Sequence, residues 1–290
     1  MRTIVIGDVH GMDRELAALW SRLEVRPDDR VVSAGDLLDK GPASPAVVRF
    51  LRERREEGFR VDLVLGNHEE KHAKFRRKRA AGGDRAVRKM GGRQRLATIT
   101  DTLSSADVAF LESAVPFLHL DDHGAVVVHA GITPDLDVLD DTPRTVSRLL
   151  RTRYVRGHTT RRVKVEFVVD SEQPLSVEEL VRQAHTTDIV SEQVRERGSF
   201  VQLGRNRPED PFWAEVYDGR FGHVYFGHEP FVQQQPQRFE HATGLDTGCV
   251  FGGWLTAAVL VAGAAPSFVS VPAQARDDWD FTALRNAFDE

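Results

Sequence analysis

Five short polar clusters in this sequence combine aspartate, asparagine and histidine with glycine. They are GDVH at 7–10, GD at 35–36, GNH at 66–68, HAG at 129–131 and GH at 227–228. The side chains in them that can bind a metal ion are Asp8, His10, Asp36, Asn67, His129 and His228. Carboxylate, amide and imidazole donors together suit manganese, iron, zinc, cobalt or nickel better than calcium. One carboxylate can bridge two such ions, and ions roughly 3.5–4 Å apart can activate a shared water for in-line displacement at phosphorus. The clusters therefore predict phosphoryl hydrolysis.

Each cluster follows a short apolar run that is rich in valine, isoleucine and leucine, which is typical of a buried strand. The runs are Thr3–Ile6, Arg30–Ser33, Val61–Leu65, Ala125–Val128 and Val224–Phe226. Helical patterns at 12–23 and 45–57 separate the first three runs, so the first half is expected to be βαβα with a largely parallel sheet. Because the carboxyl ends of strands in an open α/β sheet face one crevice, the five clusters should meet there.

The length of 290 residues is enough for a full hydrophobic core, and we expect a single domain over 1–290. The stretch from about 154 to 220 is more polar, and we expect it to be an insertion that shapes the active site. Within it, 179–198 has a helical pattern and 203–211 the composition of a loop. Near the end, Leu255–Val261 and Phe268–Val271 are separated by AGAAP, which suggests a hairpin.

The composition limits the partners and the compartment. The net charge of −5 gives no global electrostatic reason to expect a nucleic-acid partner. A lone cysteine, Cys249, excludes an intramolecular disulfide and a cysteine-based zinc site, and it agrees with a reducing compartment. The first apolar stretch is too short for an export signal, and the longest, near 254–265, is too short to span a bilayer. We therefore expect a cytoplasmic protein with no membrane contact, and the sequence implies no obligate protein partner.

A family resemblance becomes specific at these clusters and the residues that follow them. The segments GDVHG, GDLLDKGP, GNHE, HAG and GHEP, in this order, resemble the phosphoprotein phosphatase branch of the calcineurin-like metallophosphoesterases. A sixth segment, GLDTGCVFGGWLT at Gly244–Thr256, resembles the C-terminal signature of the bacterial symmetrical diadenosine tetraphosphate hydrolases and their relatives. Bacterial serine/threonine phosphatases share this likeness. The resemblance implies a four-layer αββα sandwich, an α/β fold, with the metals at the ends of the sheets and a helical or loop insertion.

The resemblance also implies a role for each polar residue. Asp8 and His10 would bind one divalent metal ion, and Asp36 would bridge it to a second. Asn67, His129 and His228 would complete the second site, and manganese is the ion we expect. His68 would protonate the leaving group. Asp39 would orient the imidazole of His68 and favour its positively charged form.

Three residues are candidates for binding the substrate phosphate. Asn67 would do so beside its metal. Lys40 stands where the family pattern usually has arginine, so it keeps the charge and loses the bidentate fork. Arg153 is our candidate for the arginine that holds the phosphate through two hydrogen bonds, because related hydrolases carry an arginine-rich segment at a similar place.

A basic run at 71–95 has two interpretations. It contains eleven lysines or arginines and one acid, Asp84. It is either a solvated helix and loop, or its first turns rim the metal site and attract a polyphosphate or an acidic strand. If the second interpretation holds, Lys74, Arg76 and Arg77 are the cations that we expect to strengthen binding of a polyphosphate.

Other polar residues near the motifs have simpler interpretations. His72 lies one helical turn after His68, and we expect it on a helix surface. His241 lies close to GLDTG and is an alternative to His228 as a ligand, although His228 follows a strand directly. Asp246 belongs to a DTG turn before an apolar strand. A structural role in this turn is sufficient to explain Asp246.

Three functions remain for comparison. The first is hydrolysis of nucleotide phosphoanhydrides, such as diadenosine tetraphosphate or cap-like dinucleotides. The second is a protein serine/threonine phosphatase, whose substrate would be a phosphoprotein. The third is a nucleic-acid-binding protein that uses 71–95 and retains only a vestigial metal site.

The predicted donors are all oxygen or nitrogen atoms, so a chelator should abolish activity and manganese should restore much of it. Asp36 should be the least replaceable, because the loss of a bridging carboxylate disturbs both ions. Asp36→Asn is expected to bind fewer than two metals per chain in elemental analysis. Retention of two metals by this variant would contradict the bridging role.

Overall fold

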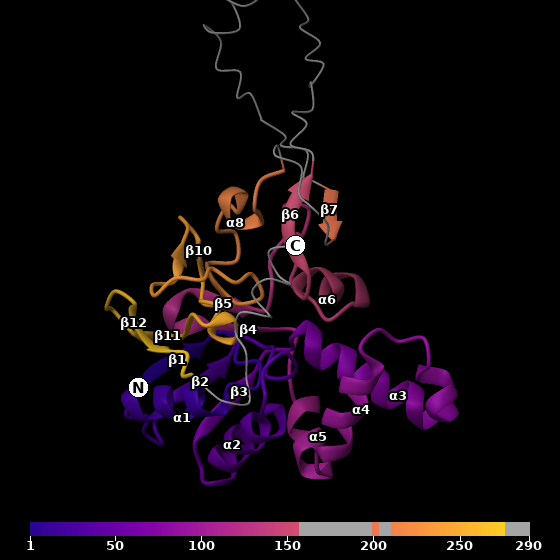
Figure 1. Cartoon of the computed structure of the whole chain (residues 1–290). Helices are drawn as coiled ribbons and strands as arrows, with labels where there is room; N and C mark the ends of the chain where they lie inside the picture. The colour runs from indigo at the N-terminus through magenta and orange to yellow at the C-terminus, as the bar shows by residue number, and fades with distance from the viewer. Residues whose placement is uncertain (157–198, 203–209, 276–290) are drawn as a thin grey trace, which may run out of the picture.

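The computed structural model of the chain describes residues 1–156, 199–202 and 210–275. Its centre is formed by two five-stranded mixed sheets (Figure 1). The predicted helix at 179–198 and most of the predicted loop at 203–211 lie outside the described residues, as does much of the predicted insertion. Among the described residues, no helix is both long and apolar enough to cross a membrane.

The first sheet has the strand order β12-β11-β1-β2-β3. Three predicted strands form its parallel part, namely β1 (Arg2–Ile6), β2 (Arg30–Ser33) and β3 (Arg60–Leu63). Helices α1 (Asp13–Arg22) and α2 (Ser44–Glu56) connect them. Strand β11 (Trp254–Val261) pairs antiparallel with β1, and β12 (Ser267–Pro272) pairs antiparallel with β11. The predicted hairpin is thus confirmed, and it extends the parallel sheet with two antiparallel strands.

The second sheet has the strand order β4-β5-β8-β10-β9. Its strands are β4 (Phe117–Leu120), β5 (Ala125–Val128), β8 (His223–Phe226), β9 (Gln237–Arg238) and β10 (Ala242–Gly244). Strand β8 is parallel to both β5 and β10, whereas β4 and β9 are antiparallel to their neighbours. The two predicted strands β5 and β8 are confirmed, but they belong to this sheet and not to that of β1. Their apolar patterns indicate strands without indicating which strands they pair with.

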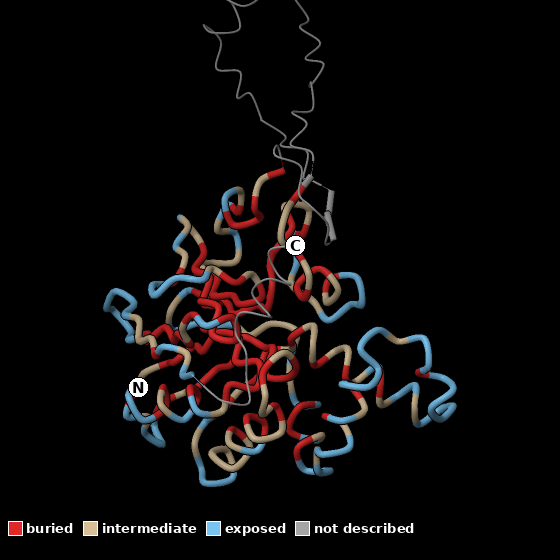
Figure 2. Tube along the Cα trace, in the orientation of Figure 1, coloured by how far each residue is buried: buried red, intermediate tan, exposed pale blue. Residues whose placement is uncertain are grey.

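Alternating side chains divide the apolar core into layers. In β1, Ile4 packs among residues of α1 and α2, while the next residue, Val5, lies between the two sheets with Val127 of β5. Val126 of β5 points the other way, toward α8 (Trp213–Val216) on the outer face of the second sheet. Figure 2 shows the buried residues concentrated on the two sheets. Helices therefore cover the outer faces of two packed sheets, and the predicted four-layer αββα sandwich is confirmed.

The remaining elements border the sandwich. They are α3 (Asn67–Val87), α4 (Arg93–Thr102), α5 (Ser105–Glu112), η1 (Asp121–His123), α6 (Pro143–Leu149), β6 (Thr152–Arg156), β7 (Ser199–Gln202) and η2 (Cys249–Phe251). Helices α3 and α4 lie together at one side of the molecule (Figure 1). Phe75, Val87 and Leu96 form a small core between them. Helix α3 is kinked at Gly82 and Gly83, where Gly83 has a φ of 63°.

Candidate metal centre and active site

The five polar clusters meet where strands of both sheets end. They follow β1, β2 and β3 of the first sheet and β5 and β8 of the second. The residues that come together are Asp8, His10, Asp36, Asn67, His129 and His228, all buried except Asn67, which is partly exposed. The sandwich therefore places all six predicted ligands around one point.

The backbone of this region is strained. Among the described residues, six that are not glycine have a positive φ. Five of these belong to the predicted site, namely His10, Asp36, Asp39, Lys40 and His228, with φ between 46° and 68°. Such conformations cost about 1–3 kcal/mol each and persist where the surrounding structure over-determines them, which is common at functional sites.

Two groups of donor atoms share the Asp36 carboxylate. One group is His10, Asp36 and His68, and the other is Asp36, His129 and His228; within each group the donor atoms lie within 4.8 Å of one another. The His10 Nε2 atom lies 3.5 Å from Asp36 Oδ2, and the His129 Nε2 atom lies 3.4 Å from Asp36 Oδ1. Each oxygen of Asp36 thus faces a different group, which is the arrangement of a bridging carboxylate.

Two other predicted ligands adjoin these groups. Asp8 Oδ2 lies 3.8 Å from His10 Nε2, and it accepts a 3.0 Å hydrogen bond from the backbone N–H of His228. Asn67 Oδ1 lies 2.9 Å from His129 Nε2. Asp8 therefore joins the His10 side of the centre, and Asn67 joins the His129 side.

The hydrogen bonds of the histidines fit a metal centre. His10 Nδ1 donates to the Leu38 carbonyl at 2.8 Å and His129 Nδ1 donates to the Ala34 carbonyl at 2.9 Å, so each ring presents Nε2 to the centre. Asp8 Oδ1 and His228 Nε2 are buried and have no hydrogen-bond partner among the described residues. Because a buried polar atom without a partner is costly, a cation at these atoms explains the arrangement.

The charges of the centre are strongly coupled. Burial raises the pKa of the Asp8 carboxyl well above its ordinary value. Burial also acts to raise the pKa of Asp36, but the imidazoles of His129 and His68 outweigh it and hold this pKa well below the ordinary value. Burial alone would lower the pKa of His129, yet Asp36 raises it to about 9. Since a metal-ligating imidazole is neutral, a metal ion and a proton compete at His129.

His68 and Asp39 form the predicted pair. His68 Nδ1 lies 2.6 Å from Asp39 Oδ2, and the other ring nitrogen lies 3.8 Å from Asp36 Oδ2, so it faces the centre. Although burial raises the pKa of Asp39, its hydrogen bonds with His68 and His72 lower it well below the ordinary value. Asp39 is therefore an anion that can stabilise a charged imidazole.

The prediction of a surface position for His72 was wrong. His72 is fully buried, and its Nε2 atom lies 3.1 Å from Asp39 Oδ1. Its Nδ1 atom lies 3.3 Å from the Thr100 hydroxyl on α4. The Arg95 guanidinium, also on α4, comes within 3.6 Å of the same Asp39 oxygen. His72 and Arg95 therefore hold Asp39 from the side opposite His68.

Glu69 is a second residue for which the sequence predicted no role. Its carboxylate accepts hydrogen bonds from the backbone N–H groups of Asp36, Leu37 and Leu38 at 2.8, 3.0 and 3.1 Å. It thereby fixes the loop that carries Asp36. Gly66 permits this contact, because a Cβ there would overlap Asp36 and the Glu69 carboxylate. The only signal in the sequence was its place in GNHE, next to His68.

The predicted phosphate-binding residues lie at the edge of the centre. Lys40 Nζ is 2.7 Å from His10 Nε2. Arg153 forms a 3.1 Å ion pair with Glu229 and donates to the carbonyl of His228 at 3.3 Å. His241 is in neither donor group and lies 3.5 Å from Glu240.

Asp246 is buried, and one of its oxygens accepts from Gly248 N–H at 3.0 Å, as expected for a turn. Its other oxygen has no hydrogen-bond partner in the part of the chain that the structure describes. Its charge acts to raise the pKa of Asp8, so it also contributes to the electrostatics of the centre.

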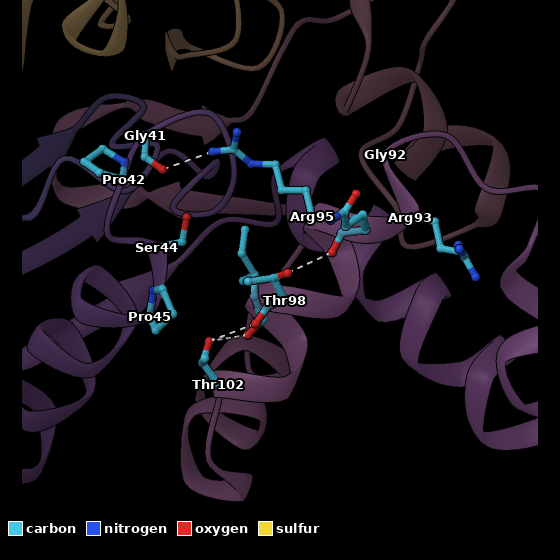
Figure 3. A pocket seen from close by; sticks show the side chains of 11 residues that line it. Gly41, Pro42, Ser44, Pro45, Gly92, Arg93, Arg95, Thr98 and Thr102 are labelled. Atoms are coloured by element: carbon cyan, nitrogen blue, oxygen red, sulfur yellow. Dashed lines mark hydrogen bonds between the residues drawn. The ribbon is translucent and has the colours of Figure 1, made fainter. Parts of the chain in front are cut away.

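A pocket of about 870 Å³ lies between the loop that follows Asp39 and helix α4 (Figure 3). Gly41, Pro42 and Pro45 line one wall, and residues of α4 line the other. Arg95 crosses it and donates to the carbonyl of Gly41 at 3.0 Å. The pocket is therefore adjacent to the His68–Asp39 pair.

The chain belongs to the calcineurin-like phosphoesterase family, whose model matches residues 1–231. The predicted resemblance is confirmed, and the protein is a phosphohydrolase of a family that uses divalent metal ions.

Its relatives include two named nucleotide hydrolases. It is 30% identical to the asymmetrical bis(5'-nucleosyl)-tetraphosphatase PrpE of Bacillus velezensis over 87% of this chain and 86% of that protein. It is also 30% identical to the symmetrical bis(5'-nucleosyl)-tetraphosphatase of Citrobacter koseri over 88% of this chain and 90% of that protein. A solved structure that is provisionally described as a diadenosine tetraphosphatase shares the fold, with a TM-score of 0.64 at 24% identity and 94% of each chain covered.

Glu69→Ala should remove the acceptor from three buried backbone N–H groups. Each unsatisfied group costs about 1–3 kcal/mol, so we expect a loss of about 2 kcal/mol or more in the free energy of unfolding. Glu70→Ala is the matched control, because the neighbouring Glu70 forms a partly exposed ion pair with Arg151 that is worth about 1 kcal/mol or less. Urea unfolding in a chelator measures both variants without a contribution from metal. Equal losses would show that Glu69 does not hold the Asp36 loop.

Proposed function

We propose that this phosphohydrolase holds two divalent metal ions and cleaves phosphoanhydride bonds of dinucleoside polyphosphates or cap-like dinucleotides. The observation that carries the proposal is the pair of donor groups that share Asp36. The names of the two nucleosyl-tetraphosphatase relatives support this substrate class.

The donor atoms suggest how the ions are held. Asp8 and His10 would bind one ion, Asp36 would lie between the two, and the second would be bound by a further set of donors. These donors are Asn67, His129 and His228. Manganese suits this mixture of oxygen and nitrogen. The ions supply charge neutralisation and water activation at the phosphorus atom.

Protein side chains supply the proton for the leaving group. His68 is assigned to this step because its Nδ1 atom is bound to Asp39 and its other ring nitrogen faces the centre. The Asp39 carboxylate stabilises the imidazolium, from which a proton passes to the departing oxygen. His72 and Arg95 contact Asp39 and position it.

Substrate binding involves the edge of the centre. Lys40 and Arg153 supply positive charge for the phosphate oxygens, and Asn67, which contacts His129, offers a hydrogen-bond donor through its amide nitrogen. The pocket next to Asp39 (Figure 3) has the size typical of ligand sites and mixes proline and isoleucine with polar side chains, so it suits a nucleoside.

A substrate panel tests the proposed function. Purified protein with manganese should show its highest kcat/KM for diadenosine tetraphosphate or a cap-like dinucleotide, compared with phosphopeptides, mononucleotides and an aryl phosphate. A wide preference for phosphopeptides would instead identify a serine/threonine phosphatase. Nucleic-acid binding without turnover of any of these compounds would favour the vestigial metal site.

The role of His68 predicts a dependence on the leaving group. His68→Asn should slow an alkyl phosphate by about 10²–10⁴-fold and an activated aryl phosphate much less, because a good leaving group departs without a proton. Asp39→Asn should show the same pattern more weakly. The kcat of each variant on both substrates measures the effect, and equal losses on the two substrates would exclude proton donation by His68.

A further inference from the structure

The basic residues of helix α3 lie on two different faces of the helix. On one face, Arg76 forms an ion pair with Glu112 of α5, and Arg79 pairs with Asp84 and with Asp101 of α4. These arginines are neutralised and hold α3 against its neighbours. Arg76, one of the three cations named for the second interpretation of the basic run, therefore contacts α5 and does not line the pocket on the other face of α3.

The opposite face carries lysines. Lys71, Lys74 and Lys78 are spaced by three and four residues, so they share one stripe of the helix. All three line a pocket of about 350 Å³ together with Asn67, Glu70, Met90, Gly91 and Arg151. Within the described residues none of the three lysines has an ion-pair partner, whereas Glu70, the one acid of the pocket, pairs with Arg151 at 2.8 Å. The pocket therefore carries an uncompensated positive charge.

The lysine stripe is continuous with the metal centre. Asn67, the first residue of α3, lines this pocket and also contacts His129 Nε2 at 2.9 Å. Lys71 lies about one helical turn beyond Asn67, and Lys78 is about 10 Å further along the axis at 1.5 Å per residue. The stripe thus leads away from the centre in a straight line.

We propose that Lys71, Lys74 and Lys78 form a subsite for the phosphates that extend beyond the scissile one in a linear oligophosphate. The inference deepens the proposed function and rests on it for the substrate. Three ammonium groups in a row match a linear chain of negative charges, and attraction grows with the number of charges. An acidic nucleic-acid strand fits less well, because the pocket is short and no aromatic side chain lines it to stack a base.

Charge-neutral variants test the subsite. The triple variant K71Q/K74Q/K78Q removes the stripe, and R85Q/R88Q/K89Q is a matched control. The control lowers the net charge by the same amount as the triple variant. Its substitutions lie on α3 and the turn after it, at residues that do not line the pocket. The readout is the ratio of KM for diadenosine tetraphosphate to KM for an aryl phosphate, which carries a single phosphate. We expect this ratio to rise about tenfold in the triple variant and to stay constant in the control. Added salt should raise the wild-type ratio more than the ratio of the triple variant.

Inhibition separates this inference from the proposed substrate. Inorganic tripolyphosphate should compete with the aryl phosphate at least about tenfold better than orthophosphate in wild type, and lose this advantage in the triple variant. The comparison is made at fixed free manganese, because oligophosphates bind the ion themselves. Such inhibition without turnover of diadenosine tetraphosphate would support the subsite and overturn the dinucleotide substrate. Equal KM ratios in the two triple variants, or no advantage of tripolyphosphate in wild type, would overturn the subsite.

Discussion

The buried carboxylate of Asp36 is the constraint on which the rest of the site depends. It is 1% exposed, and burying an ion costs several kcal/mol unless donors and opposite charges surround it. One oxygen accepts the backbone N–H of His68 at 3.0 Å and faces His129, while the other faces His10 and His68. The carboxylate oxygens of Glu69 fix the loop behind it. The imidazoles of His10, His68 and His129 must therefore be in place for this carboxylate to be tolerated as an anion.

The two sheets supply this environment jointly. The first sheet carries Asp8, His10 and Asp36, whereas the second carries His129 and His228. The two sheets are packed closely here, because a Cβ on Gly227 would overlap Asp8 Oδ1. In addition, the backbone N–H of His228, the next residue, donates a hydrogen bond to Asp8 Oδ2. Neither sheet can form the centre alone. The site is therefore assembled when the apolar layer between the two sheets packs.

Local patterns in the sequence predicted β1, β2, β3, β5 and β8, the hairpin of β11 and β12, and the polar residues at strand ends, because these depend on short-range periodicity. They did not separate β5 and β8 from the first sheet, since an apolar run does not encode its partner strand. The surface position expected for His72 failed for a related reason. Its burial depends on Thr100, 28 residues later, and on Asp39, 33 residues earlier, and neither contact leaves a local signal. The same applies to Glu69, whose partners lie in the loop after β2.

Helix α3 joins these features in one rigid element. Its first turn carries Asn67, His68 and Glu69, so a ligand, the proposed acid and the support of the Asp36 loop are fixed relative to one another. The stripe of His68, His72 and Phe75 faces inward and is largely buried, which leaves the lysine stripe on the outer side. Lys78 is the last lysine of this stripe before the kink at Gly82 and Gly83, beyond which the helix changes direction. The length of straight helix between the metal centre and this kink therefore limits how many phosphates the lysines can contact, and a longer oligophosphate would gain little further affinity from α3.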